Sequence, residues 1–330
     1  MSELFKSRRA RALIVFFVFG LVCLSIAYFK SSRGLFEPGQ GERDKQVSND
    51  YGLPVKLADL ENRAITESSG VASSRSNADF FWTHNDSGDG PFIYAFDRQG
   101  KHRGVWRVTG ADAVDWEDMA IGPGPKQGQP YIYVGDIGDN GKVRGEIIVY
   151  RVAEPSIAPE DSSSTTQSPR DTGPAEVIRL KYPDGKHDAE SLLVHPSTGD
   201  LYIVTKVRGS AAGVYKLTAP FPQSEVATLD YIGEVSFPDK GIGFLTGGDI
   251  SPDGRRVILC DYAGACELVL PDSQGTAFDD IWSQPLLPIN IGERQQGEAI
   301  CYRADGLALL ATSERLACPL IEITRSNRER

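Results

Sequence analysis

Short apolar runs separated by turn residues dominate the chain from about residue 50 onward. Runs such as Phe80–Trp82, Tyr131–Val134 and Leu201–Val204 are rich in aromatic and β-branched side chains, and glycine, aspartate or asparagine follows them closely. This pattern is typical of β-strands joined by tight turns. The 34 glycines and 20 prolines of the 330-residue chain fit the same interpretation. We therefore expect an all-β fold.

One unit recurs roughly every 50 residues. In each copy an acidic residue opens a short apolar strand, and a turn and two further β-rich runs follow it. Units of this length with four short strands predict the blades of a β-propeller. We count five blades, while a degenerate sixth stays open. The five opening acids are Glu67, Glu117, Glu190, Asp249 and Glu298.

The fourth, outer strand of each unit is weaker, and the fifth unit reaches its end at Arg330 without one. Residues 51–57 precede the first unit and have the composition of a strand, so we expect them to complete the last blade and close the ring. We assign residues 51–330 to the propeller. Within it, residues 155–174 are rich in serine, threonine and proline, which predicts a disordered insertion.

The N-terminus carries basic residues before an uncharged apolar run, Ala12–Phe29. That run is long enough to cross a bilayer as a transmembrane helix, and the basic residues predict a cytoplasmic N-terminus with an extracytoplasmic body. The alternative is a signal peptide cleaved near Ala27, which would leave a secreted or periplasmic body. Residues 1–29 are thus a signal-anchor or a signal peptide, and residues 30–50 a polar tether. The anchor would make the membrane a partner of the chain.

Composition narrows the function further. The formal net charge of −10 would repel a nucleic acid, so we expect no nucleic-acid partner. The cysteines beyond the apolar run have no zinc-site spacing, and they are either buried thiols or members of one or two disulfides. These four are Cys260, Cys266, Cys301 and Cys318.

The opening acids should converge, because the innermost strand of each propeller blade lines a central channel. Carboxylates gathered in a low-dielectric channel repel one another unless a cation neutralises them, and hard oxygen ligands suit Ca²⁺. Asp115 and Asp188 add a second carboxylate just before Glu117 and Glu190. The alternative is that each acid caps a backbone amide or pairs with an arginine.

Acidic turns follow the second strand in the first two units. Asp86 and Asp89 flank a glycine in the first unit, and Asp136 and Asp139 do so in the second. Either these carboxylates join the metal site or they form Asx-type hairpin turns. The opposite side of the mouth is expected to bind an anionic ligand through basic side chains. Those basic residues are Lys206, Arg208 and Arg315.

Four motifs carry a resemblance to known proteins: Asn85–Asp89, Asp115–Asp118, Gly135–Asn140 and Tyr182–Glu190. They resemble motifs of bacterial exported β-propellers of unassigned function and, more distantly, of the SdiA-regulated family and the β-propeller phytases. The resemblance implies a calcium-binding propeller in the cell envelope, and in the phytases a metal-bound water that attacks phosphate. The basic residues that bind phosphate in the phytases are matched at most by Lys206, Arg208 and Arg315.

These observations predict an envelope-tethered, Ca²⁺-binding propeller that recognises a small anionic ligand, a sugar or a protein at its channel mouth. The alternative is an enzyme, a metal-dependent phosphoester hydrolase. In that case Glu117, Asp136 and Glu190 would hold the metal, and Lys206 or Arg315 would hold the phosphate. The common motifs of serine hydrolases, zinc proteases and nucleotide-binding folds are absent from the sequence.

Overall fold

The computed structural model describes residues 50–207, 210–236, 244–273 and 275–326. The predicted N-terminal segment 1–29, nearly all of the expected tether and Arg208 lie outside the described residues. Within the described ranges, no helix has the length and apolar character needed to cross a membrane.

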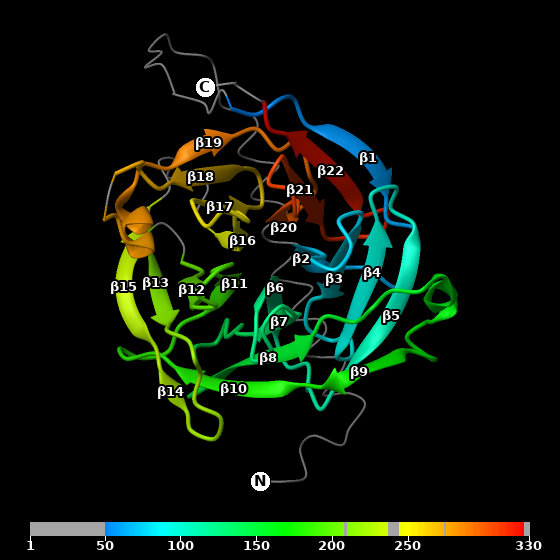
Figure 1. Ribbon diagram of the computed structural model, residues 1–330, viewed down its shortest axis with the longest axis horizontal. Helices are drawn as coiled ribbons and strands as arrows, with labels where there is room; N and C mark the ends of the chain where they lie inside the picture. Colours follow the sequence, from blue (N-terminus) through cyan, green and yellow to red (C-terminus); the bar gives the residue numbers. More distant parts are fainter. Residues whose placement is uncertain (1–49, 208–209, 237–243, 274, 327–330) are drawn as a thin grey trace. The chain divides into compact units, whose positions relative to one another are not determined.

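Five sheets stand around a central axis as the blades of a propeller, each with four consecutively paired antiparallel strands (Figure 1). Blade 1 contains β2 (Ser68–Ser73), β3 (Phe80–Asn85), β4 (Phe92–Asp97) and β5 (His102–Thr109). Blade 2 contains β6 (Trp116–Pro123), β7 (Pro130–Asp136), β8 (Ile147–Ala153) and β10 (Glu176–Lys181). Blade 3 contains β11 (Ala189–Val194), β12 (Leu201–Thr205), β13 (Ala212–Leu217) and β15 (Asp230–Val235). Blade 4 contains β16 (Leu245–Ile250), β17 (Arg256–Asp261), β18 (Ala265–Val269) and β19 (Leu287–Ile289), and the 3₁₀ turn η2 (Phe278–Ser283) precedes β19.

Blade 5 combines the two ends of the described chain, as expected from the missing outer strand. It contains β20 (Gly297–Tyr302), β21 (Ala308–Ser313), β22 (Pro319–Thr324) and β1 (Val55–Asp59). Strand β1 pairs antiparallel with β22, with Val55 opposite Glu322. Just before β1, the Tyr51 hydroxyl donates a 2.6 Å hydrogen bond to Glu267 Oε1 on β18 of blade 4. The prediction of five blades closed by the N-terminal strand is confirmed.

The hydrophobic core is divided among the five interfaces between neighbouring blades. Each cluster of buried apolar side chains draws on two adjacent blades, for example blades 1 and 5 around Phe81 and Leu310. The remaining clusters fill the other four interfaces in the same way. Inner strands such as β2, β11 and β20 are therefore buried along their whole length, between two neighbouring sheets. Cys260, Cys301 and Cys318 lie in this interior as free thiols.

The 155–174 segment is ordered, in contrast to the predicted disordered insertion. It forms the 3₁₀ turn η1 (Pro159–Ser163) and the strand β9 (Arg170–Pro174), which pairs parallel with β5 of blade 1. Hydroxyl groups hold it there: Val105 N donates to Ser164 Oγ at 2.8 Å and Thr109 N donates to Thr172 Oγ1 at 3.0 Å. The segment has few apolar residues, of which Ile157 packs against the core between blades 1 and 2, and its polar side chains satisfy an otherwise open strand edge. Strand β14 (Ala227–Thr228) covers the edge of blade 2 likewise.

Candidate metal centre at the channel mouth

A bulge near the start of every inner strand determines which residues face the channel mouth. The pairing of each inner strand with the second strand of its blade shifts by one residue at this point. The shifts align the five strands, so one residue of each occupies the same level. Those residues are Ser69, Glu117, Glu190, Thr246 and Glu298. Three of the five opening acids thus share this level.

The other two opening acids lie elsewhere. Glu67 precedes Ser69 by two residues, is exposed, and forms a β-bridge with Glu314 of blade 5. Asp249 lies three residues beyond Thr246, toward the opposite end of the channel. Its Oδ2 accepts a 2.9 Å hydrogen bond from Tyr302 N, and burial raises the pKa of its carboxyl to about 6. Asp249 therefore caps a backbone amide of the neighbouring blade, the alternative considered for these acids.

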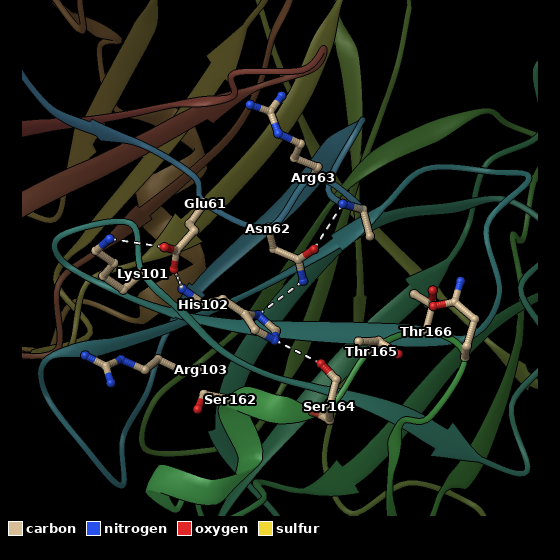
Figure 2. A pocket seen from close by; sticks show the side chains of 12 residues that line it. Glu61, Asn62, Arg63, Lys101, His102, Arg103, Ser162, Ser164, Thr165 and Thr166 are labelled. Atoms are coloured by element: carbon tan, nitrogen blue, oxygen red, sulfur yellow. Dashed lines mark hydrogen bonds and ion pairs between the residues drawn. The ribbon is translucent and has the colours of Figure 1, made fainter.

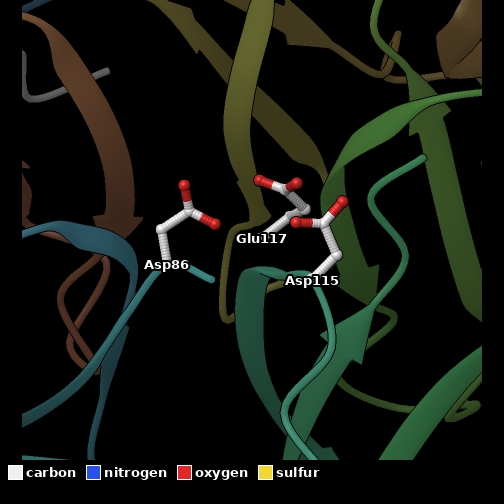
Figure 3. A group of neighbouring side chains, drawn as sticks. All are labelled: Asp86, Asp115 and Glu117. Carbon is white, nitrogen blue, oxygen red and sulfur yellow. The ribbon is translucent and has the colours of Figure 1, made fainter. Parts of the chain in front are cut away.

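Eight carboxyl groups and one lysine gather at the mouth, and we name them the channel-mouth cluster. Asp86 follows β3, Asp115 precedes β6, and Glu117 lies on β6. Oxygen atoms of these three residues all lie within 4.8 Å of one another, and Figure 3 shows the side chains converging. The members of the cluster are Glu67, Asp86, Asp115, Glu117, Asp188, Glu190, Glu298, Glu314 and Lys206.

Two carboxyl groups in the cluster are buried without a partner. Glu117 and Glu298 are each 4% exposed. Within the described part of the chain, neither side chain accepts a hydrogen bond or forms an ion pair. Buried carboxyl groups in folded proteins are ordinarily hydrogen-bonded or paired, because the loss of hydration is otherwise uncompensated. Their oxygens are not among the fully occluded polar atoms of the described chain that lack a partner, so both carboxyl groups border the channel, where water or a cation can reach them.

The loop after β7 lies directly against these acids. A Cβ atom at Gly138 would collide with Glu117 Oε1 and with Asp115 Oδ2. Gly138 N donates a 3.2 Å hydrogen bond to Asp115 O, which holds the loop in this position. A larger residue at position 138 would have to displace these carboxylate groups.

The electrostatics of the cluster disfavour negative charge. Burial and, after it, the neighbouring carboxylates raise the pKa of Asp115 to about 6 and that of Glu314 to about 7. For Glu117 and Glu298 burial again raises the pKa well above its ordinary value, with the Glu190 carboxylate as the next cause. Desolvation and like-charge repulsion thus act together, and a cation placed among these groups would relieve both.

Lys206 is already engaged within the cluster. Its Nζ forms an ion pair with Glu190 Oε1 and donates a 3.0 Å hydrogen bond to the Tyr262 hydroxyl. The ammonium also lies 5.7 Å from the centre of the Phe244 ring. Burial raises the pKa of Glu190 to about 7, while Lys206 acts in the opposite direction. This lysine neutralises a buried carboxylate, whereas the sequence suggested an anion-binding role.

The remaining predicted site residues support the loops around the mouth. Asp136 Oδ1 forms a 2.7 Å ion pair with Arg144, and Asp136 Oδ2 accepts a hydrogen bond from Val114 N at 3.1 Å. Asp139 accepts backbone N–H groups of its own turn at 2.8 Å, as in the Asx-turn alternative. Asp89 accepts hydrogen bonds from the Asn85 amide at 2.8 Å and from the Tyr94 hydroxyl at 2.6 Å.

The predicted metal ligands and the predicted anion-binding basic residues do not form two groups in the way that the sequence suggested. Within the described residues, Asp86, Asp115 and Glu117 form the one group of three with metal-ligand proximity, and it does not include Asp136. Of the expected basic residues, Arg315 is exposed beside Glu314, and its backbone N donates to Thr66 O at 2.7 Å.

Asp118 is a structural residue whose role the sequence did not indicate. It is fully buried, and its Oδ2 accepts hydrogen bonds from Leu192 N at 3.0 Å and Gly248 N at 3.3 Å. Its Oδ1 accepts a third, from Met119 N at 2.8 Å. One carboxyl group of blade 2 therefore ties blades 3 and 4 together across the channel, directly beneath the channel-mouth cluster.

A separate hollow of about 710 Å³ lies at the outer edge of blade 1 (Figure 2). His102 spans its base: Asn62 Nδ2 lies 3.1 Å from Nδ1, and Ser164 O lies 3.0 Å from Nε2. The charged side chains in its wall are mostly paired, as in the Lys101–Glu61 ion pair of 3.1 Å. The polar groups of this hollow thus join the 155–174 segment to the propeller.

Comparisons with known proteins leave the family open. No family model matches the chain and no curated protein matches it, so neither comparison supports the expected resemblance to the SdiA-regulated family or the phytases. A structure titled as a putative oxidoreductase (glucose dehydrogenase) from Thermus thermophilus aligns at 11% identity with a TM-score of 0.43, over 82% of this chain and 100% of that chain. A chain of a nidogen–laminin complex aligns at 14% identity with a TM-score of 0.40, over 76% of this chain and 73% of that chain. The assignment of a β-propeller rests on the strand pairing.

Proposed function

We propose that this chain is an envelope-tethered β-propeller that binds a divalent cation, Ca²⁺, at its channel mouth. The bound ion and the loops around it form the surface that recognises a small anionic ligand, a sugar or a protein. The N-terminal apolar run holds the body at the membrane on its extracytoplasmic side. Asp86, Asp115 and Glu117 supply the carboxylate oxygens for the ion.

The observation that carries this proposal is the state of Glu117. It is 4% exposed, lies in the group of three carboxylates within 4.8 Å, and has no partner among the described residues. Calcium accepts six to eight oxygen ligands, including waters and backbone carbonyls, so three carboxylates leave positions for water or for an oxygen of a ligand. Those open positions suit the recognition of an anionic or hydroxyl-rich molecule.

If calcium binds the folded chain and not the unfolded chain, it stabilises the fold. At a hundredfold excess over Kd, linkage adds about 2.7 kcal/mol to the free energy of unfolding. For a domain of this size we expect the Tm of the full-length chain to rise by roughly 5–10 °C between EDTA and calcium. Differential scanning calorimetry with EDTA or with calcium chloride measures this difference directly.

Two variants separate a metal ligand from a structural acid. Glu117→Gln removes one ligand charge, so the calcium effect should become small, while in EDTA the variant should melt at or above wild type because repulsion is relieved. Asp249→Asn is the control, because Asp249 bonds a backbone amide at the other end of the channel. It should lower the Tm equally in calcium and EDTA. Wild type that melts identically in both solutions would refute the proposed site.

A further inference from the structure

The hollow at the outer edge of blade 1 has a wall that blade 2 supplies. Blade 1 joins its third and fourth strands through residues 98–101, whereas blade 2 uses residues 154–175 for the same connection. That longer connection runs onto blade 1, where β9 pairs with β5 and residues 162–167 line the hollow together with the loop 61–64. The volume of about 710 Å³ is in the range of small-molecule sites, and loops on a rigid scaffold commonly form such sites.

Hydrogen bonds fix the base of the hollow. The Ala64 backbone N–H donates to Asn62 Oδ1 at 3.0 Å, so the amide nitrogen of Asn62 is the atom that faces His102 Nδ1 at 3.1 Å. His102 Nδ1 therefore accepts a hydrogen bond, and its Nε2–H donates to Ser164 O at 3.0 Å. These bonds connect the loop 61–64, β5 and the 155–174 segment. A site whose walls are already held in place loses little conformational entropy when a ligand binds.

Positive charge gathers around this hollow, although the whole chain has a net charge of −10. Three basic side chains and one acid line it, namely Arg63, Lys101, Arg103 and Glu61. Arg103 is paired with the buried carboxylate of Asp97. The pair of Lys101 and Glu61, at 3.1 Å, has both side chains more than half exposed, and such pairs contribute little to stability. Arg63 is exposed and has no hydrogen-bond or ion-pair partner within the described ranges.

Uncharged polar groups form the rest of the lining. Thr166 and Gln167 lie at the tip of a turn, and their side chains make no hydrogen bond within the part of the chain that the structure describes. Figure 2 shows Thr166 across from Asn62 and His102. Among the described residues of the lining, Ala64 alone is apolar. An apolar ligand would remove these polar groups from water without compensation, so the hollow suits a molecule rich in hydroxyl groups.

We infer that this hollow binds a small sugar that carries a carboxylate, a uronic acid. The Arg63 guanidinium and the Lys101 ammonium bind the carboxylate, because the planar guanidinium matches a carboxylate in a two-bonded arrangement. The hydroxyl groups of the sugar bond to Thr166 and Gln167 on the opposite wall. This site uses no metal ion, lies apart from the channel-mouth cluster and does not depend on the function proposed for that cluster.

The test is isothermal titration calorimetry of the full-length chain with sodium glucuronate and with glucose, both in EDTA. Glucuronate should bind, and glucose should bind more weakly because it lacks the carboxylate. Arg63→Gln should weaken glucuronate binding roughly tenfold, the effect of one lost hydrogen bond to a charged group. Arg315→Gln is the matched control, because Arg315 is an exposed arginine beside Glu314 at the channel mouth. It should bind glucuronate as wild type does.

Two results would overturn the inference directly: no binding of glucuronate to folded wild type, or equal affinities for glucuronate and glucose. Weaker binding in Arg315→Gln, with none lost in Arg63→Gln, would place the sugar at the channel mouth and overturn it as well. If Arg63→Gln does not fold, Lys101→Gln decides, since removing an exposed pair costs little stability. It should also weaken glucuronate binding, and an unchanged affinity would refute the site. The calcium site is tested separately, by melting in calcium and in EDTA.

Discussion

Tyr51 gives a sharp test of how the ring is closed. It lies before β1, and its hydroxyl donates a 2.6 Å hydrogen bond to Glu267 Oε1 on blade 4. Glu267 is fully buried and also accepts hydrogen bonds from the Tyr302 hydroxyl at 2.8 Å and from the Arg256 guanidinium at 3.0 Å. Tyr51→Phe removes one donor from a buried carboxylate and keeps the ring in place. The N-terminal segment thus contributes to blade 4 as well as to blade 5.

The expected cost follows from the nature of this hydrogen bond. Hydrogen bonds to charged groups contribute about 1.5–3 kcal/mol, and the two donors that remain on Glu267 favour the lower end, about 1.5 kcal/mol. For a domain of this size that corresponds to a decrease in Tm of roughly 3–6 °C. Leu53→Ala is the control from the same segment, because Leu53 is 82% exposed, and it should change the stability by less than about 0.5 kcal/mol.

Urea unfolding followed by tryptophan fluorescence measures these differences. A chain that begins at Ala58 lacks Tyr51 and most of β1, so it should lose more than Tyr51→Phe does, by several kcal/mol. In a Glu267→Gln background the Tyr51→Phe change should cost less, because the charged acceptor is gone. Suppose that Tyr51→Phe has the same free energy of unfolding as Leu53→Ala, and that the shortened chain has the same free energy of unfolding as wild type. The N-terminal segment then does not close the ring.

Three further predictions concern the channel and the rim. The buried carboxyls of Glu190 and Glu314 have folded-state pKa values of about 7, above their unfolded values, so their favourable contribution to stability is present at low pH and is lost as the pH rises from about 4.5 through 7. Calorimetry in EDTA should therefore give a lower Tm at pH 8 than at pH 6. An equal Tm at the two pH values would contradict the raised pKa values. Asp118→Ala leaves three buried backbone N–H groups without an acceptor and should cost at least about 3 kcal/mol in urea unfolding, with or without calcium. Ser164→Ala should cost about 1–2 kcal/mol, because Val105 N loses its acceptor, and Ser163→Ala on the exposed side of the same turn should cost little; equal stability of the two would mean that the 155–174 segment does not pack as described.

The blades were predictable because the strands of blades 1 to 4, and the three inner strands of blade 5, follow one another in the sequence with repeating composition and turns. Which acids meet at the channel mouth was not predictable, because a bulge of one residue decides the level of each side chain. In blades 1 and 4 the repeating sequence pattern predicted Glu67 and Asp249 at the channel mouth, whereas the residues at the shared level are Ser69 and Thr246. The ion pair of Lys206 with Glu190 lies within one blade, sixteen residues apart in the sequence, yet only the strand register brings the two groups together.

The pairing of β1 with β22 has a consequence for the order in which the protein is made. A ribosome synthesises Val55 near the beginning of the chain and its partner Glu322 close to the end. During translation, blades 1 to 4 can form from contiguous sequence, but the last blade has no outer strand until the C-terminal residues have emerged and found one made much earlier. Contacts between such distant segments are slow to form and leave strand edges open in the meantime. Ring closure is therefore expected to be the final, post-translational step of folding, and a nascent chain halted before Pro319 should remain an open arc.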